Sequence, residues 1–394
     1  MIILKSIMVN MVCIVLAVAA TRTVRLDSIV STSEAKGLWP SSSNTGKLFY
    51  SKIGVLLLNK RVVYFDKVNN DVVTEFRVLP NKRYSMIPVS LVANSSTYAC
   101  VYNNPANGRY RIGVFDNNGG KLIVKRPHHT GHASYKVFSQ QEGETIYLIS
   151  PHLSGYEKAL DLYDENSMTP SQYSRDKFDA FFRENKAFTI WKHDEKLEPV
   201  DSADVINRVG VDLEEYLKLY DNQAVDQDKD SNIHLIHSSK NYLIRSYSPS
   251  LQLEKEFRCE NNDFKPIPKM LVKGDAKKLK SKQGSYSIFY ALYSINDWLV
   301  TSFYQNPEGW ERPEGPYYYD IHAKDGQKKT SGQLPYPFFG RDDEGNMYLY
   351  VMKESDSWLG DDEYYLVEIS IAELIAGKVN QSFVLNRIKQ DSND

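Results

Sequence analysis

The sequence predicts an all-β protein, a six-bladed β-propeller of four-stranded antiparallel blades. One observation is a recurring strand that ends in an aromatic or aliphatic residue before a polar turn. A second is that an apolar strand precedes each copy and a charged strand follows it. Once obvious insertions are subtracted, the copies are separated by about the length of one blade. The residues that mark the six copies are Phe65, Phe115, Trp191, Tyr247, Ile321 and Ile369.

The strand before each marker strand is apolar on both faces. Polar turns at 230–232 and 344–346 introduce two of these strands, as hairpins require. Apolar strands belong inside the ring, and charged strands belong at its wet rim. The apolar strands are expected at 54–59, 97–103, 145–150, 232–237, 297–304 and 346–352.

Composition fits a strand-rich repeat protein. Tyr is frequent, at 27 of 394 residues, and aromatic and β-branched residues favour strands. The formal net charge is −2, with acids and bases interspersed, so the chain lacks the basic surface that nucleic acid requires. The basic stretch 273–282 is an exception that we interpret as a solvated loop. We therefore expect no nucleic-acid partner.

The first twenty residues, 1–20, have the features of a signal peptide. Lys5 precedes an apolar run, and small residues at 17–20 suit a signal peptidase. The run is too short for a comfortable membrane span. We expect an exported protein, periplasmic, at the cell surface or secreted, with no transmembrane span in the mature chain. A lipoprotein anchored through Cys13 is the weaker alternative, because bulky residues precede this cysteine.

We divide the mature chain into an N-terminal segment, 21–44, and the propeller, 45–390, with an insertion at 151–187 in the third blade. Either a strand near 24–29 or the C-terminal segment 381–388 completes the last blade, and we expect the C-terminal segment to do so. Helix is scarce. Short helices are expected at 174–184, inside the insertion, and at 212–219 and 371–376.

Two cysteines follow the leader, Cys100 and Cys259. The repeat places Cys100 in an inner strand of the second unit and Cys259 just after an outer strand of the fourth. A disulfide needs Cα atoms within roughly 7 Å, which these positions do not allow. We expect two free, buried thiols.

The stretch 59–66, Asn-Lys-Arg-Val-Val-Tyr-Phe-Asp, is similar to the N-x-R-I-x-x-F-D step of an NHL repeat. Later copies match this step less closely, and Tyr242 stands where the step has Arg. Spacing and turns over 45–388 resemble the six-bladed propellers of the NHL and TolB-like group, which includes exported bacterial members. That group contains scaffolds, ligand binders and a few enzymes, so the resemblance implies the architecture and no single activity.

The long insertions are predicted to gather on one face of the ring. In a blade with strands A to D from the axis outward, the B–C and D–A connections share one face, and the A–B and C–D turns share the other. Long loops in a compact fold are more often functional than short turns, so the face with the insertions is our expected binding face. The long segments are 126–132, 151–186, 259–285, 303–319 and 354–365.

Two of these segments contain aromatic residues flanked by carboxylates. Such sets suit sugars, peptides or cationic ligands, because rings stack on C–H faces and on cations while acids accept hydrogen bonds. Plain packing between loops explains the same residues, and a glycosidase would need two carboxylates about 5–10 Å apart. The candidate ligand-binding residues here are Trp310, Tyr317, Trp358, Asp361 and Asp362.

Histidines form the pattern H-H-x-x-H in the segment 126–132. A zinc site needs three or four protein ligands, and no Cys or obviously placed carboxylate completes this set. We interpret the segment as a solvated or ligand-contacting loop, with His129 and His132 as candidate ligand-binding residues. We expect no metal and no cofactor.

The run 226–232 alternates Asp and Asn as calcium loops do. An EF-hand loop needs Gly at its sixth position and Glu at its twelfth, where this chain has Ser231 and His237. The EF-hand is therefore excluded. A hairpin turn rich in Asp and Asn explains the run, and a less regular calcium site is left open.

These observations favour an exported propeller that binds an unknown protein, peptide or glycan through the long loops on one face, without chemistry. The local signatures of common enzymes, G-x-S-x-G, the P-loop, H-E-x-x-H and C-x-x-C, are absent. The alternative is a glycan-active propeller enzyme, a hydrolase or lyase, that uses carboxylates or histidines at the channel mouth. A purely structural domain is the third alternative.

Overall fold

The computed structural model of the 394-residue chain consists mainly of β-strands. None of the helices in the described part of the chain is both long and apolar enough to cross a membrane. The leader, the predicted helices at 174–184 and 212–219, and the basic stretch 273–282 lie outside the described residues. The described residues are 23–38, 46–47, 49–50, 52–58, 61–77, 87–93, 97–104, 109–116, 121–125, 136–140, 146–151, 186–194, 196–206, 223–237, 242–266, 286–306, 315–355 and 361–391.

The strands form six sheets. Sheet one contains β3 (Phe49–Tyr50), β4 (Ile53–Leu57), β5 (Arg61–Asp66) and β6 (Asp71–Arg77). Sheet two contains β7 (Ile87–Ala93), β8 (Thr97–Asn104), β9 (Arg109–Asp116) and β10 (Lys121–Lys125). Sheet three contains β11 (Lys136–Gln140), β12 (Ile146–Pro151), β13 (Lys186–His193) and β14 (Pro199–Ile206).

The second half of the ring is built in the same way. Sheet four contains β15 (Gln223–Gln227), β16 (Ile233–His237), β17 (Leu243–Tyr247) and β18 (Leu253–Arg258). Sheet five contains β19 (Tyr286–Ile295), β20 (Trp298–Asn306), β21 (Tyr317–Ala323) and β22 (Lys328–Leu334). Sheet six contains β23 (Phe338–Arg341), β24 (Met347–Lys353), β25 (Glu363–Ile369) and β1 (Thr23–Arg25), with β2 (Gly46–Lys47) parallel to β23.

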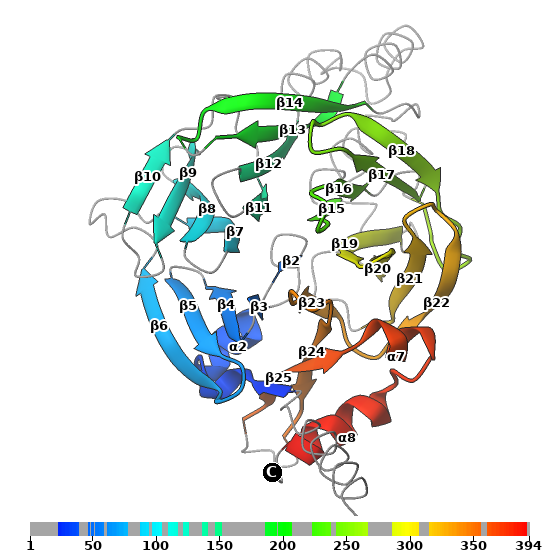
Figure 1. Ribbon diagram of the computed structural model, residues 1–394. Coiled ribbons are helices and arrows are strands. Elements are labelled where there is room, and N and C mark those ends of the chain that lie inside the picture. Colours follow the sequence, from blue (N-terminus) through cyan, green and yellow to red (C-terminus); the bar gives the residue numbers. More distant parts are fainter. Residues whose placement is uncertain are drawn as a thin grey trace, which may run out of the picture.

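The sheets surround a central axis, which makes the molecule a β-propeller (Figure 1). Except for β2 beside β23, neighbouring strands are antiparallel. In sheets two to five the first strand in the chain lies near the axis and the last lies at the rim, as β11 and β14 show. The predicted marker strands are therefore the third strands of the sheets, and the predicted apolar strands are the second.

Burial along the strands follows their distance from the axis. The third strand β21 is buried along nearly its whole length, whereas the outer strands β18 and β22 are mostly exposed. Phe65, Ile321 and Ile369, three of the predicted markers, are fully buried. β18 carries Lys and Glu and β22 carries Lys, because the outer edge of these strands meets water. The predicted gradient from apolar to charged strands is confirmed.

Apolar side chains fill the space between neighbouring sheets. Between sheets four and five, Tyr242 packs against Phe289 with ring centroids 4.8 Å apart, and Phe289 packs against Phe303 at 5.5 Å. Between sheets one and two, Val62 shares a buried cluster with Tyr98. Each of these sheets therefore buries its faces against its neighbours, as the blades of a propeller do.

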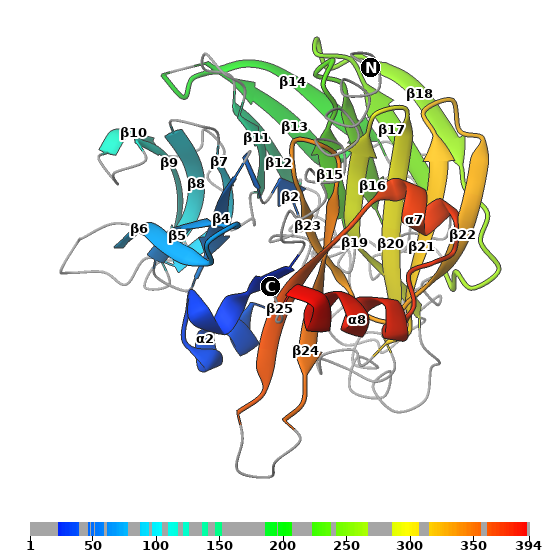
Figure 2. The same ribbon diagram turned by 60° about the horizontal axis from the view of Figure 1, so that its bottom comes forward.

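The C-terminal segment does not complete the last sheet, contrary to the expectation from sequence. β1 pairs with β25 instead, and the C-terminal residues form helix α8 (Gln381–Asp391). Val384 and Ile388 lie on its buried side, and this spacing of four residues suits a helix rather than a strand. Asn380 Oδ1 accepts a hydrogen bond from the Phe383 backbone and caps the helix start. Figure 2 shows α8 beside β25.

The N-terminal segment belongs to the ring. A 3-10 turn, η2 (Leu26–Ser28), and a helix, α2 (Thr32–Gly37), follow β1. Leu26 is fully buried in a cluster that also contains Phe65 of sheet one and Tyr350 of sheet six. The segment therefore fills the seam between the first and last sheets.

Two smaller predictions are confirmed. Helix α7 (Ile371–Ile375) lies where a short helix was expected. Cys100 in β8 and Cys259 directly after β18 are free and buried. They belong to different sheets, which explains why no disulfide joins them.

Candidate functional site

The connections at the two ends of the sheets differ in length. A–B and C–D connections are short, and none exceeds the five residues of 228–232 or 342–346. Because neighbouring strands within each blade are antiparallel, B–C and D–A connections share the other end. The strand order agrees with the predicted gathering of the insertions. Apart from the N-terminal segment 26–45, the connections of nine residues or more are all of the B–C or D–A kind and are 78–86, 126–135, 152–185, 207–222, 259–285, 307–316 and 354–362.

Three of the candidate binding residues, Tyr317, Asp361 and Asp362, lie in the described part of the chain. Tyr317 is the first residue of β21 rather than part of a loop, and its buried ring lies 6.3 Å from that of Tyr290. Asp361 is exposed, and Asp362 accepts a hydrogen bond from the Ser355 backbone at 3.4 Å. The remaining candidates lie outside the described residues. These are His129, His132, Trp310 and Trp358.

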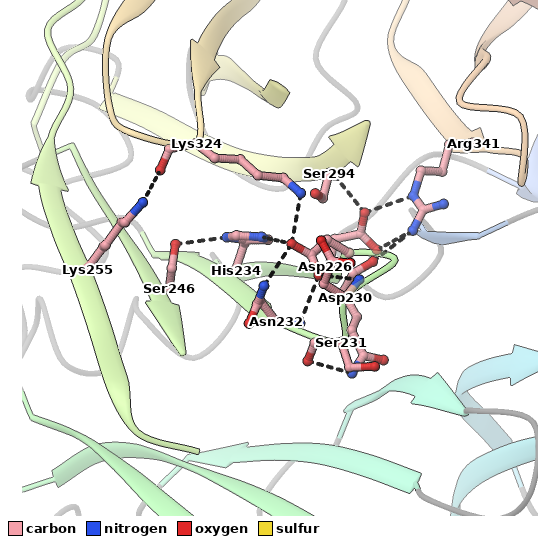
Figure 3. A network of polar contacts seen from close by, with 12 residues as sticks. Asp226, Asp230, Ser231, Asn232, His234, Ser246, Lys255, Ser294, Lys324 and Arg341 are labelled. Atoms are coloured by element: carbon pink, nitrogen blue, oxygen red, sulfur yellow. Dashed lines mark hydrogen bonds and ion pairs between the residues drawn. The ribbon is translucent and has the colours of Figure 1, made fainter. Parts of the chain in front are cut away.

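A network of polar side chains lies at the short-turn end, around the hairpin between β15 and β16 (Figure 3). At its centre, Asp228 Oδ1 accepts hydrogen bonds from the backbone of Asp230 at 2.9 Å and of Asn232 at 2.8 Å. Asp228 Oδ2 lies 3.2 Å from His234 Nε2 and accepts a hydrogen bond from Lys324 Nζ at 2.8 Å. Nitrogen donors therefore occupy both carboxylate oxygens, and the Asp-rich run forms a hairpin turn.

Electrostatics keep Asp228 ionised. Burial alone would raise the pKa of this carboxyl group. Hydrogen bonds from His234 and Lys324 outweigh burial and hold the pKa of Asp228 well below its usual value. Asp228 is therefore a charged partner of Lys324 and is unsuited to act as a general acid near neutral pH.

The same arrangement recurs in sheet six, in the hairpin between β23 and β24. Asp342 accepts hydrogen bonds from the Asn346 backbone at 2.8 Å and from Tyr348 Oη at 3.0 Å. Lys67 Nζ lies 3.5 Å from Asp342 Oδ2. Both hairpins follow the pattern D-x-x-x-N-x-[HY], and both lysines directly follow the third strand of the next sheet. Lys324 thus ties sheet five to sheet four, and Lys67 ties sheet one to sheet six.

The carboxylate of Asp226, in the inner strand β15, is bound by residues of the inner strands of two other sheets. Arg341 in β23 donates from Nε to Asp226 Oδ2 at 2.8 Å and from Nη2 to Oδ1 at 2.9 Å. The backbone of Ser294 in β19 donates to the same carboxylate at 2.8 Å. In the described part of the chain, the buried hydroxyl groups of Tyr293 and Ser294 have no hydrogen-bond partner. Burial raises the pKa of Tyr293, so its hydroxyl stays protonated.

A second buried cluster lies between sheets four and five. Both oxygens of Asp320 lie 2.9 Å from Asn261 Nδ2, and Lys328 Nζ lies 3.1 Å from Oδ1. Cys259 Sγ lies 4.0 Å from His322 Nδ1. Burial raises the pKa of the Cys259 thiol and lowers that of His322. The pair is therefore a neutral thiol beside a neutral imidazole, which is not the ion pair of an activated cysteine nucleophile.

In these clusters, buried carboxylates form ion pairs that join different sheets. The carboxylates of Asp226, Asp228 and Asp342 face cationic side chains from other sheets. Among the residues that the structure describes, no group of three His, Cys, Asp or Glu is arranged to hold a metal ion.

The residues of this network were only partly visible in the sequence. The turns at 230–232 and 344–346 were recognised, and the Asp four positions before each Asn is a usable signal because its side chain closes the turn. Lys67, Lys324 and Arg341 carry no local pattern, since their partners lie on other sheets.

The comparisons with known proteins concern the fold. No family model and no curated protein matches this chain. A member of the DUF4221 family from Bacteroides vulgatus has a similar structure, with a TM-score of 0.51, 9% sequence identity, and coverage of 89% of this chain and 97% of that one. A protein of unknown function from Bacteroides caccae aligns with a TM-score of 0.42, 8% identity, and coverage of 82% and 96%. The chain is thus a β-propeller similar in structure to the Bacteroides vulgatus protein.

Proposed function

We propose that the chain is a six-bladed propeller, with each sheet forming one blade, that binds a ligand or partner protein at the end of the ring with the long connections. The observation that carries this proposal is the difference between the two ends. One end has short turns, and its described central acids are paired with cationic side chains. The other end receives every long connection, including those with Trp310 and Trp358. Binding residues concentrate on loops that a rigid scaffold positions.

The proposal includes export and membership of the NHL and TolB-like group. The leader at 1–20 supports export, and the step at 59–66 supports the group. Binding at the loops requires no cofactor, metal or nucleic acid.

The glycan-active alternative has less support. An acid catalyst needs a carboxyl group with a raised pKa. At the short-turn end, Asp226 is paired with Arg341, and Asp228 has a lowered pKa beside Lys324. These acids are suited to holding the ring together.

A thermal-shift screen of the mature chain against glycans, peptides and amines tests the proposal. A ligand at a hundredfold excess over its Kd is expected to stabilise the protein by about 2.7 kcal/mol. Trp310→Ala and Trp358→Ala are expected to abolish the shift. Lys229→Ala, an exposed change at the short-turn end, is the matched control and is expected to preserve it.

Two outcomes would contradict the proposal. Retention of the shift in both tryptophan variants, together with its loss in Lys229→Ala, would place binding at the opposite end. Release of shortened glycan from a hit would establish the hydrolase or lyase alternative instead.

A further inference from the structure

A cysteine and a histidine face each other in the seam between sheets four and five. Cys259 directly follows β18, and His322 lies in β21. The distance from Cys259 Sγ to His322 Nδ1 is 4.0 Å, and the two residues are 63 positions apart in the chain. Their exposed fractions are 5% and 1%. The folded ring therefore buries together two side chains of the kinds that bind metal ions.

The imidazole ring of His322 has little else to bind. Among the described residues, the thiol is the one hydrogen-bonding contact of this side chain, and Nε2 is buried without a partner. The rings of Tyr242 and Phe257 surround it, with centroids 6.0 Å and 6.2 Å away. A buried polar group without a partner costs roughly 1–3 kcal/mol. Packing alone would favour an apolar side chain here, so a ligand of the histidine explains its presence better.

The neighbouring carboxylate does not complete a zinc site. Both oxygens of Asp320 lie 2.9 Å from Asn261 Nδ2, and Oδ1 lies 3.1 Å from Lys328 Nζ. In the described part of the chain, no third His, Cys, Asp or Glu forms a metal-binding group with the pair. Zinc is held by three or four protein ligands. Two ligands suit an ion that accepts a lower coordination number.

The separation of the two ligand atoms also disfavours zinc. Bond lengths of roughly 2.3 Å to sulfur and roughly 2.0 Å to nitrogen place two tetrahedral ligands roughly 3.5 Å apart. The 4.0 Å between Cys259 Sγ and His322 Nδ1 requires a more open angle at the metal. Cu⁺ and Ag⁺ are soft ions that prefer thiolate sulfur and accept two ligands on nearly opposite sides. The observed separation favours ions of this kind.

The charge of a monovalent ion suits the buried seam. A thiolate, a monovalent cation and a neutral imidazole sum to zero. A divalent cation would leave one positive charge among apolar rings, and an unpaired buried charge is costly. When the ion binds, the Sγ–H bond of Cys259 is replaced by a sulfur–metal bond and the proton passes to solvent.

We propose that Cys259 and His322 form a two-ligand site for Cu⁺. The ion lies between Sγ and Nδ1, and it joins the residue that follows the outer strand of sheet four to the third strand of sheet five. The protein without metal keeps the neutral thiol and the neutral imidazole described above. The site is independent of ligand binding at the long connections, so the failure of either proposal leaves the other standing.

Titration with Ag⁺ in chloride-free buffer tests the site, because Ag⁺ has the same preferences as Cu⁺ and is not oxidised by air. The mature chain is used, so Cys13 of the leader is absent. One Ag⁺ is expected to bind per chain. Cys259→Ala and His322→Phe each remove one ligand and are expected to weaken binding at least about a hundredfold, since loss of a residue that merely supports a ligand costs roughly 10–100-fold.

Cys100→Ala is the matched control. It removes the other free, buried thiol, which donates to the backbone oxygen of Val101 at 3.6 Å. This variant is expected to bind Ag⁺ as the wild type does. The thermal midpoint of each metal-free variant verifies that it is folded.

X-ray absorption of the wild-type protein, loaded with Cu⁺ without air, tests the ligands without any substitution. One sulfur and one nitrogen neighbour of copper are expected. Absence of Ag⁺ binding, loss of binding in Cys100→Ala, or copper with sulfur neighbours alone would overturn the proposal. So would unchanged binding in His322→Phe, which would show a thiol acting by itself, or tighter binding of Zn²⁺ than of Cu⁺.

Discussion

The surroundings of a single residue decide its chemistry, as His322 in β21 shows. The ring is almost fully buried, and its Nε2 has no hydrogen-bond partner among the described residues. Burial lowers the pKa of His322, although the neighbouring Asp320 opposes this change. The native protein therefore holds the neutral imidazole, and a proton on this ring would be buried with its charge poorly compensated.

Acid is expected to destabilise the protein through His322. The ring has an ordinary pKa of 6.5 in the unfolded chain and a lower one in the folded chain, so the unfolded chain binds the proton more tightly. The contribution of the neutral ring is complete above pH 6.5 and is lost as the pH falls through 6.5 toward the folded pKa. His322→Gln is expected to show a smaller loss of unfolding free energy than the wild type between about pH 7.5 and pH 5.5.

Urea unfolding of both proteins at the two pH values measures this difference. The quantity compared is the change in unfolding free energy between the two pH values. A stability cost of the glutamine that is the same at both pH values therefore does not affect the comparison. The same pH dependence in both proteins would show that His322 is not the responsible group.

At the scale of elements, the two D-x-x-x-N-x-[HY] hairpins act as the points where sheets are joined. In each, an aspartate folds the turn between the first two strands and then accepts a lysine from the next sheet. A hydrogen-bonded ion pair that is shielded from water contributes more than an exposed one. The turns therefore shape their own sheets and also position the neighbouring ones.

Removing one lysine is expected to loosen the joint between sheets four and five. Lys324→Met keeps the aliphatic stem and removes the ammonium group, which leaves the buried Asp228 with one cationic partner fewer. The free energy of unfolding is expected to fall by about 2 kcal/mol. Lys229→Met, on the exposed side of the same hairpin, is the control and is expected to change it by less than about 0.5 kcal/mol. Equal effects from the two changes, measured by urea unfolding, would exclude this role of Lys324.

At the scale of the whole molecule, the ring closes without a covalent bond. Sheet six receives its outer strand from the N-terminal segment, and the seam with sheet one is filled by residues of that segment. Thr23 Oγ1 also donates to Asp391 of α8 at 2.6 Å, so segments from near both ends of the chain meet at the seam. Closure therefore depends on the packing of these segments.

Leu26→Ala is expected to weaken this closure. Leu26 is fully buried in the cluster shared by sheets one and six, so the change leaves a cavity at the seam. The free energy of unfolding is expected to fall by about 3 kcal/mol. Leu122→Ala, a substitution at an exposed leucine, is expected to change it by less than about 0.5 kcal/mol. Chemical unfolding that finds both variants equally stable would show that the N-terminal segment does not hold the ring closed.

The strands, their order and the short turns could be predicted from the sequence. These features are local, because apolar periodicity and residues such as Asn232 and Gly345 act over a few neighbours. The same patterns placed Cys100 and Cys259 on different units and predicted helix α7. The strand positions also predicted which connections are long. The order of the strands then assigned each connection to one end of the ring.

The segment that closes the ring and the cations that pair with the central acids are set by contacts between distant parts of the chain. Thr23–Arg25 and Gln381–Asp391 both contain apolar residues, so either could have supplied the last strand. The strand that pairs with β25 is Thr23–Arg25, which lies more than 300 residues before β25 in the chain. Arg341 and Asp226 are likewise separated by 115 positions in the chain. Long-range pairs of this kind depend on the geometry of the assembled ring, which leaves no periodic signal near either residue.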